Sequence, residues 1–182
     1  MNADRSNFNQ YPDAPKQRMR GFSLTELSVA VAITAVLAGT AVPAIGNLVA
    51  DARQRQIATT FSDSLRLARR TAATSGSEVI VCPYTPDNTC GNDWSAGWVV
   101  ARHSAQHMQP VRIHALLNKQ VEIHANRTQL LFDPLKRDTN GSIVFCDQRG
   151  ADHALTVVLS YTGKTRLVTR DKYDAVPEGL CG

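Results

Sequence analysis

The most unusual acidic residue of this chain is Glu26. It stands directly before residues 27–50, a segment without one charged side chain. A carboxylate at the centre of a membrane helix costs about 3 kcal/mol to insert into a bilayer, so an acidic residue beside or inside such a span is a candidate functional site. Two roles are open for Glu26: a functional charge within the membrane, or a hydrated carboxylate at the level of the lipid headgroups.

Basic side chains gather near the C-terminus, where residues 160–172 hold only one acidic residue. The four basic residues there are Lys164, Arg166, Arg170 and Lys172. They share one parity, so on an unbroken strand all four would project from one face. Such a face attracts nucleic-acid phosphates, or it simply protects a sheet edge from aggregation. The net charge of +4 is too small to decide between the two.

The apolar segment is long enough to cross a membrane as a helix, since residues 27–50 span roughly 36 Å at ~1.5 Å per residue. Lys16, Arg18 and Arg20 precede it, so the positive-inside rule places residues 1–21 in the cytoplasm and the rest across the membrane. A small-residue sequence typical of signal-peptide cleavage lies inside the run and not after it, at residues 30–32. Ordinary signal-peptide removal is therefore disfavoured.

Four cysteines lie on the side placed outside the cytoplasm, where disulfides persist. They are Cys82, Cys90, Cys146 and Cys181, and three pairings are possible. One arrangement closes the loop from Cys82 to Cys90 and ties the C-terminus to a core strand through Cys146 and Cys181. A zinc site is the alternative, but the chain has no C-x-x-C pair and its histidines show no ligand spacing.

Hydrophobic periodicity predicts the elements that position these residues. An apolar stripe at Ile57, Phe61, Leu65, Ala68 and Ala72 predicts that one helix runs from 23 to 74, with its arginines on a solvated face. After Gly76 the period changes to two, and short strands are predicted. Their ranges are 78–84, 97–103, 111–117, 121–125, 129–133, 142–148, 154–161 and 164–170. The fold class is therefore α+β, a long N-terminal helix packed on antiparallel sheet.

Residues 21–26, Gly-Phe-Ser-Leu-Thr-Glu, resemble the processing site of type IV pilins and type II secretion pseudopilins. The resemblance implies that a prepilin peptidase cuts after Gly21, that Phe22 becomes the methylated N-terminus, and that Pro43 kinks the helix. It also implies that Glu26 offsets the new α-amino group of a neighbouring subunit during assembly with major and minor pilins. The implied domains are a leader at 1–21, a bacterial inner-membrane half-helix at 22–50, an amphipathic half at 51–76 and a periplasmic domain at 77–182, later exposed on a surface pilus.

Several later segments resemble the FimT/GspH family within that class, and this resemblance covers essentially the whole chain. These segments are the cysteine-flanked loop followed by 93–98, the turn at 132–134 before 140–143, and the hairpin at 162–166. Trp94 and Trp98 are expected to pack at a core edge. The FimT branch binds DNA through Gly-Arg-x-Arg, and here the motif is Gly163-Lys164-Thr165-Arg166. Lys164 keeps the charge but lacks the planar fork of arginine.

The resemblance implies a minor pilin that binds DNA during natural transformation, with Lys136 and Arg137 extending the basic surface if the fold brings them near. The alternative is a structural subunit, either a minor pilin that primes assembly or a secretion pseudopilin, that contacts only protein. We expect no enzyme and no cofactor, since no catalytic Ser/His/Asp set or phosphate loop is recognisable. The five histidines are expected to be surface or strand residues: His103, His107, His114, His124 and His153.

Overall fold

The computed structural model describes residues 21–87, 89–103, 108–117, 120–136, 139–169 and 180–181, without the side chains at 40 and 43. It divides into two units, 1–44 and 45–182, which are described separately. The basic residues of the leader lie outside the described residues. So do Arg137, Arg170 and Lys172.

One helix, α1, spans Leu24–Ser75, as the apolar stripe predicts. Ser23 caps its start, because the Ser23 Oγ accepts a hydrogen bond from the Glu26 amide at 3.2 Å. In the first unit, the helix is long and apolar enough to cross a membrane, and its most apolar window has a mean hydropathy of 2.0 with no part buried. The Thr34 hydroxyl bonds to the carbonyl of Ala30 at 3.0 Å, so this polar group is satisfied within the helix.

Among the described residues of the second unit, eight strands form two antiparallel sheets. The first sheet has the order β3-β2-β1-β5, and the second has the order β4-β6-β7-β8. The first contains β1 (Val79–Pro83), β2 (Gly97–His103), β3 (Met108–Ala115) and β5 (Leu130–Phe132). The second contains β4 (Val121–Ala125), β6 (Gly141–Asp147), β7 (Leu155–Leu159) and β8 (Thr165–Thr169). Two short 3-10 helices are η1 (Trp94–Ala96) and η2 (Ala151–His153). The α+β prediction is confirmed.

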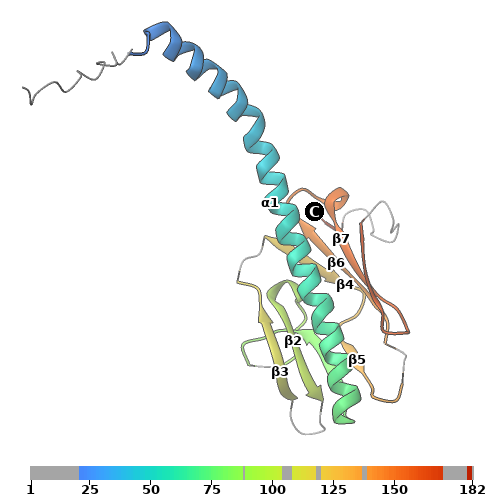
Figure 1. The fold of residues 1–182 in the computed structure, drawn as a ribbon. Coiled ribbons are helices and arrows are strands. Elements are labelled where there is room, and N and C mark those ends of the chain that lie inside the picture. Colours follow the sequence, from blue (N-terminus) through green and yellow to red (C-terminus); the bar gives the residue numbers. More distant parts are fainter. Residues whose placement is uncertain are drawn as a thin grey trace, which may run out of the picture. The chain divides into compact units, whose positions relative to one another are not determined.

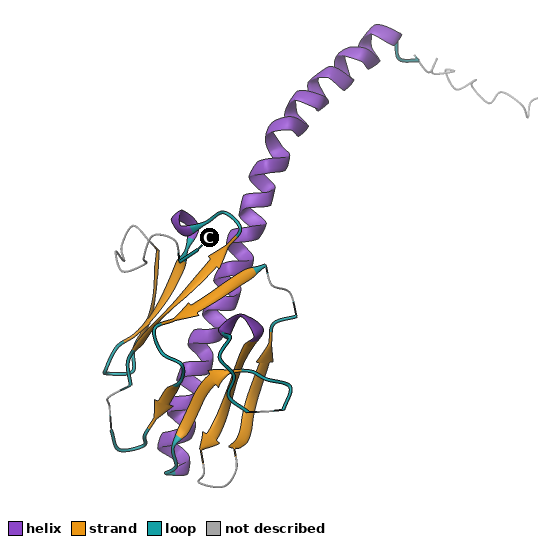
Figure 2. Cartoon of the chain, turned by 180° about the vertical axis from the view of Figure 1, so that it is seen from behind, coloured by secondary structure: helices purple, strands orange, loops and turns teal. Residues whose placement is uncertain are grey.

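The helix and both sheets share one hydrophobic core, because residues 45–75 of α1 lie on one face of the two sheets (Figures 1 and 2). Phe61 is fully buried at its centre and makes edge-to-face contacts with Trp94, Trp98 and Phe145 at centroid distances of 5.7, 5.0 and 5.8 Å. Trp98 is 0% exposed and its Nε1 donates to the Ser64 hydroxyl at 2.9 Å. The two tryptophans therefore lie inside the core, where Phe61 of the helix reaches them, and not at its edge as expected.

Two disulfides close the domain. Cys82 pairs with Cys90, and Cys146 pairs with Cys181. The second bridge holds the C-terminal end against β6, where Val144, Cys146 and Ala154 form a small cluster with Leu180. These pairs are one of the three pairings that the sequence leaves open, and all four cysteines are used.

Candidate functional site

The described residues of the predicted processing segment are exposed in the structure. Gly21, Phe22 and Glu26 are exposed, and Phe22 is 84% exposed. Pro43 lies within the bounds of α1, but its side chain is outside the described part. The roles of these residues in cleavage and assembly remain predictions.

The basic motif near the C-terminus lies on a tight hairpin between β7 and β8. Ser160 and Lys164 close the turn, since the Ser160 amide donates to the Lys164 carbonyl at 3.0 Å and the Gly163 amide donates to the Ser160 carbonyl at 2.7 Å. Gly163 has φ +73°, a left-handed conformation that favours glycine. The predicted hairpin is confirmed, and a glycine before Lys164 is what its turn requires.

The hairpin rests against a residue of the helix that the sequence did not connect with it. The Arg69 guanidinium donates a hydrogen bond to the Thr162 carbonyl, across 93 residues of sequence. A Cβ added to Gly163 would overlap this guanidinium. The predicted solvated face of the helix therefore holds for Arg53, Arg55, Arg66 and Arg70, which are exposed, but Arg69 is partly buried against the hairpin.

A groove of about 510 Å³ lies between the helix and this hairpin. Three of its lining residues are cationic: Arg66 from α1, and Lys164 and Arg166 from the hairpin. Lys164 and Arg166 are exposed. The Arg66 guanidinium lies 3.3 Å from the Asp63 carboxylate, and both side chains are more than half exposed. An exposed pair of this kind contributes little to stability, so an external anion can compete for Arg66.

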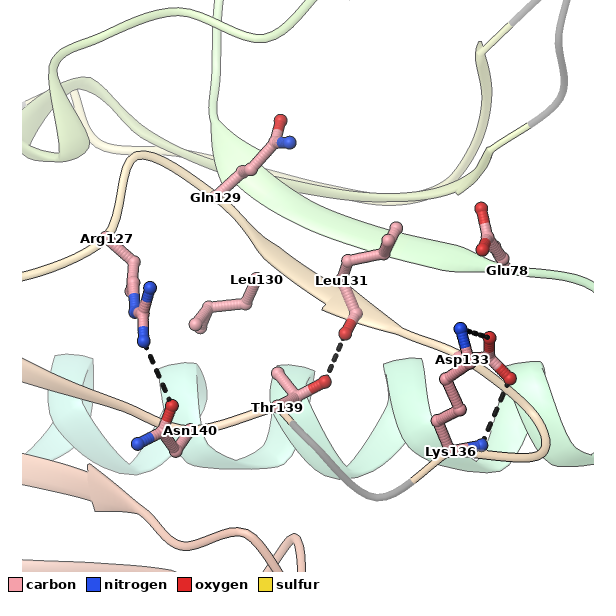
Figure 3. Close-up of a pocket in the computed structure, with 9 residues that line it drawn as sticks. All are labelled: Glu78, Arg127, Gln129, Leu130, Leu131, Asp133, Lys136, Thr139 and Asn140. Carbon is pink, nitrogen blue, oxygen red and sulfur yellow. Dashed lines mark hydrogen bonds and ion pairs between the residues drawn. The ribbon is translucent and has the colours of Figure 1, made fainter.

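The loop that follows β5 also reaches the hairpin. Arg69, Lys136, Tyr161 and Gly163 line one pocket of about 160 Å³, so the fold brings Lys136 next to the motif. Lys136 Nζ lies 3.9 Å from Asp133 Oδ2, and Figure 3 shows the pair in a neighbouring pocket of about 240 Å³. Hydrogen bonds from the backbone amides of Leu135 and Lys136 hold the pKa of the Asp133 carboxyl below its usual value.

The predicted one-sided basic strand can be followed only at its start. Arg166 pairs in register with Val158 of β7, and within β8 it shares a face with Val168, while Leu167 points to the opposite face. Lys164 precedes the strand. The expectation that Arg170 and Lys172 continue this face stays a prediction, because both lie outside the described residues.

A second charged cluster, which the sequence did not reveal, joins the helix to the turn after β6. The Arg149 guanidinium lies 2.5 Å from Asp147 Oδ2 and 2.7 Å from Asp51 Oδ1 of α1. Burial acts to raise the pKa of Asp147, but hydrogen bonds from Arg149 outweigh it and lower this pKa below its usual value. Hydrogen bonds to Asp147 and Asp51 raise the pKa of Arg149, so Arg149 and Asp147 are both ionised near neutral pH.

Nothing in the described residues fits a metal centre, because no three His, Cys, Asp or Glu side chains among them come together. His114 of β3 stacks on Trp98 at a centroid distance of 4.3 Å, and burial lowers its pKa. The strand role expected for this histidine agrees with its position in β3.

Two parts of this chain match known protein families. The family described as "Type II transport protein GspH" matches residues 58–163, more than half of the chain. The chain belongs to the GspH family. A prokaryotic N-terminal methylation motif matches residues 16–42, which include the Gly-Phe junction and Glu26. This GspH-family protein is thus a type IV minor pilin or pseudopilin of the GspH/FimT-like type.

The solved structures of one minor pilin, FimU, agree with the fold. Two crystal forms of the type IV minor pilin FimU of Pseudomonas aeruginosa are similar, with TM-scores of 0.54 and 0.53 and identities of 17% and 16%. They cover 66% and 65% of this chain and 91% and 94% of FimU. The minor pseudopilin EpsH of Vibrio cholerae matches with a TM-score of 0.48 and 14% identity, covering 63% of this chain and 95% of EpsH. The comparison with curated proteins found no match.

Proposed function

We propose that this GspH-family protein is a minor pilin of a type IV pilus that binds DNA without sequence preference during DNA uptake in natural transformation. The observation that carries the proposal is the groove between α1 and the hairpin. Lys164 and Arg166, both exposed and both cationic, line this groove. Ammonium and guanidinium groups neutralise phosphates and release counterions from the duplex, which favours binding regardless of sequence. Lysine contacts phosphate as a point charge, so Lys164 supports attraction without a bidentate geometry.

The N-terminal segment supplies the location that this function needs. We propose that prepilin peptidase removes residues 1–21, that residues 22–50 anchor the chain in the inner membrane, and that residues 51–76 join the domain at 77–182 in the periplasm. The subunit then enters a filament with major and other minor pilins. The match to the N-terminal methylation motif and the single apolar helix among the described residues support this division.

A second candidate is a pseudopilin of type II secretion that contacts only protein. The family description, a type II transport protein, favours it. Both candidates need the membrane helix and Glu26, but only the first needs the cations of the hairpin. The two are therefore separated by DNA binding.

The test measures the affinity of the full processed chain, held in an uncharged detergent, for a random-sequence DNA duplex by fluorescence anisotropy. The variant Lys164→Gln/Arg166→Gln removes two phosphate contacts and is expected to weaken binding on the order of 50-fold at about 0.1 M salt. The matched control Arg55→Gln/Arg102→Gln removes the same charge from two exposed arginines elsewhere and is expected to bind nearly like wild type. Absent wild-type binding at low salt would reject the DNA-binding proposal in favour of a subunit that contacts only protein. Equal losses in the two variants would reject the role of Lys164 and Arg166.

A further inference from the structure

The hairpin that carries Lys164 and Arg166 meets a part of α1 that lies almost one hundred residues earlier in the chain. Arg66 lines the same groove as Lys164 and Arg166. Arg70 lies one helical turn after Arg66, on the same side of α1, and is exposed. A ligand that reaches the hairpin in this groove therefore also meets a cation of the helix, Arg66.

Arg69 has a different position from these exposed arginines. As a residue, Arg69 is partly buried. Its guanidinium donates to the carbonyl of Thr162, the residue directly before Gly163. Since Gly163 has no Cβ, the guanidinium can lie directly against the turn. Arg69 thus fixes the backbone immediately ahead of the first cation of the motif.

We infer that the nucleic-acid site of this protein is built from two elements, with Arg66 as a phosphate-binding residue on α1 and Arg69 as a positioning residue for the hairpin. This inference rests on the proposed function and extends its site beyond the C-terminal motif. The occupant is duplex DNA held by its phosphates, because the groove is lined by cations and small polar residues and by no aromatic residue among the described ones. Tyr161 lies in the neighbouring pocket as a single ring, which is too little for a row of stacked bases.

The carboxylate of Asp63 beside the site provides a test in which a substitution is expected to strengthen DNA binding. Asp63 lies 3.3 Å from Arg66 and competes with phosphate for it. Asp63→Asn is expected to tighten duplex binding several-fold, whereas Arg66→Gln is expected to weaken it and to reduce the salt slope by about 0.9. Arg55→Gln, an exposed arginine of the same helix away from this groove, serves as the control and is expected to leave both values unchanged.

The positioning role is tested first with variants that keep every charge. Gly163→Ala would push the Arg69 guanidinium away from the turn, and it also places an alanine at φ +73°. Gly76→Ala is the matched control, because Gly76 has φ +63° and open space around it. Both variants are expected to lose a similar amount of thermal stability, but only Gly163→Ala is expected to weaken DNA binding several-fold. Arg69→Lys, which keeps the charge, is expected to retain more affinity than Arg69→Gln.

These measurements use the full chain in uncharged detergent, with duplex DNA and a single strand of equal length as probes. The inference is overturned if Lys164→Gln/Arg166→Gln abolishes binding while Arg66→Gln and Gly163→Ala behave like their controls. Tighter binding of the single strand than of the duplex would overturn the choice of occupant. If Lys164→Gln/Arg166→Gln itself has no effect, the proposed function fails, and that outcome is distinct from the first.

Discussion

Replacing Arg149 with alanine tests how the domain is held to α1. The Arg149 side chain is 18% exposed, and that of Asp147 is 7% exposed, so the substitution leaves an almost buried carboxylate without its cation. Breaking a buried pair in this way costs about 3–5 kcal/mol. Asp51 is half exposed and adds little, so the low end of that range applies, about 3 kcal/mol. For a unit of this size, that corresponds to a melting temperature lower by about 10 °C.

Thermal and denaturant unfolding at pH 7, followed by circular dichroism, measures this loss. Arg102→Ala removes an exposed arginine and is expected to change the free energy of unfolding by less than about 0.5 kcal/mol. The double variant Arg149→Met/Asp147→Asn removes both charges and is expected to recover part of the loss. A change of less than about 0.5 kcal/mol in Arg149→Ala would refute the argument, because no isolated carboxylate would then have been left buried.

The pH dependence provides a second measurement of the same cluster. The folded pKa of Asp147 is lower than its unfolded value of about 3.9, so its carboxylate stabilises the fold above that pH. This contribution is lost as the pH falls through the lower, folded pKa. Wild type is therefore expected to lose stability more steeply than Arg149→Ala below about pH 4. Parallel acid curves for the two proteins would contradict this assignment.

The remaining predictions concern the hydrophobic core, the two disulfides and the N-terminus. Serines in place of the Cys146–Cys181 pair are expected to lower the free energy of unfolding by about 4 kcal/mol by denaturant titration, more than serines in place of the shorter Cys82–Cys90 loop. Trp98→Phe removes a buried hydrogen bond and part of the core, and is expected to cost about 2 kcal/mol in the same assay. Mass spectrometry of the mature protein is expected to find a methylated N-terminus at Phe22, and any other start would contradict the predicted cleavage. Glu26→Ala is expected to leave membrane insertion intact and to prevent incorporation into filaments, as measured in sheared pilus fractions.

Elements that follow local rules could be predicted from the sequence. The apolar stripe from Ile57 to Ala72 predicted a helix from 23 to 74, and α1 spans Leu24–Ser75. Alternation and turn residues predicted all eight described strands. The bounds of β2 and β4 are as predicted, and the ends of the others shift by one to three residues. The hairpin at Gly163 was predictable for the same reason, because its turn residue is adjacent to its strands.

Contacts between distant segments were not predictable in this way. Arg69 has no sequence feature that distinguishes it from the exposed arginines around it, and only the packing of the hairpin on α1 selects it. Arg149 likewise meets Asp51 across almost one hundred residues. One local signal was available. A glycine within a turn indicates a left-handed backbone conformation or the close approach of another group to the backbone. Gly163 has φ +73° and lies directly against the Arg69 guanidinium.

The salt dependence of duplex binding by the full processed chain tests the central claim most directly. If Lys164, Arg166, Arg170 and Lys172 each neutralise one phosphate and Arg66 neutralises a fifth, the logarithm of the association constant falls with the logarithm of salt concentration with a slope near −4.5. Lys164→Gln/Arg166→Gln is then expected to reduce the slope to about −2.7. A wild-type slope near zero, or a slope that this double variant leaves unchanged, would contradict a DNA-binding role for the hairpin.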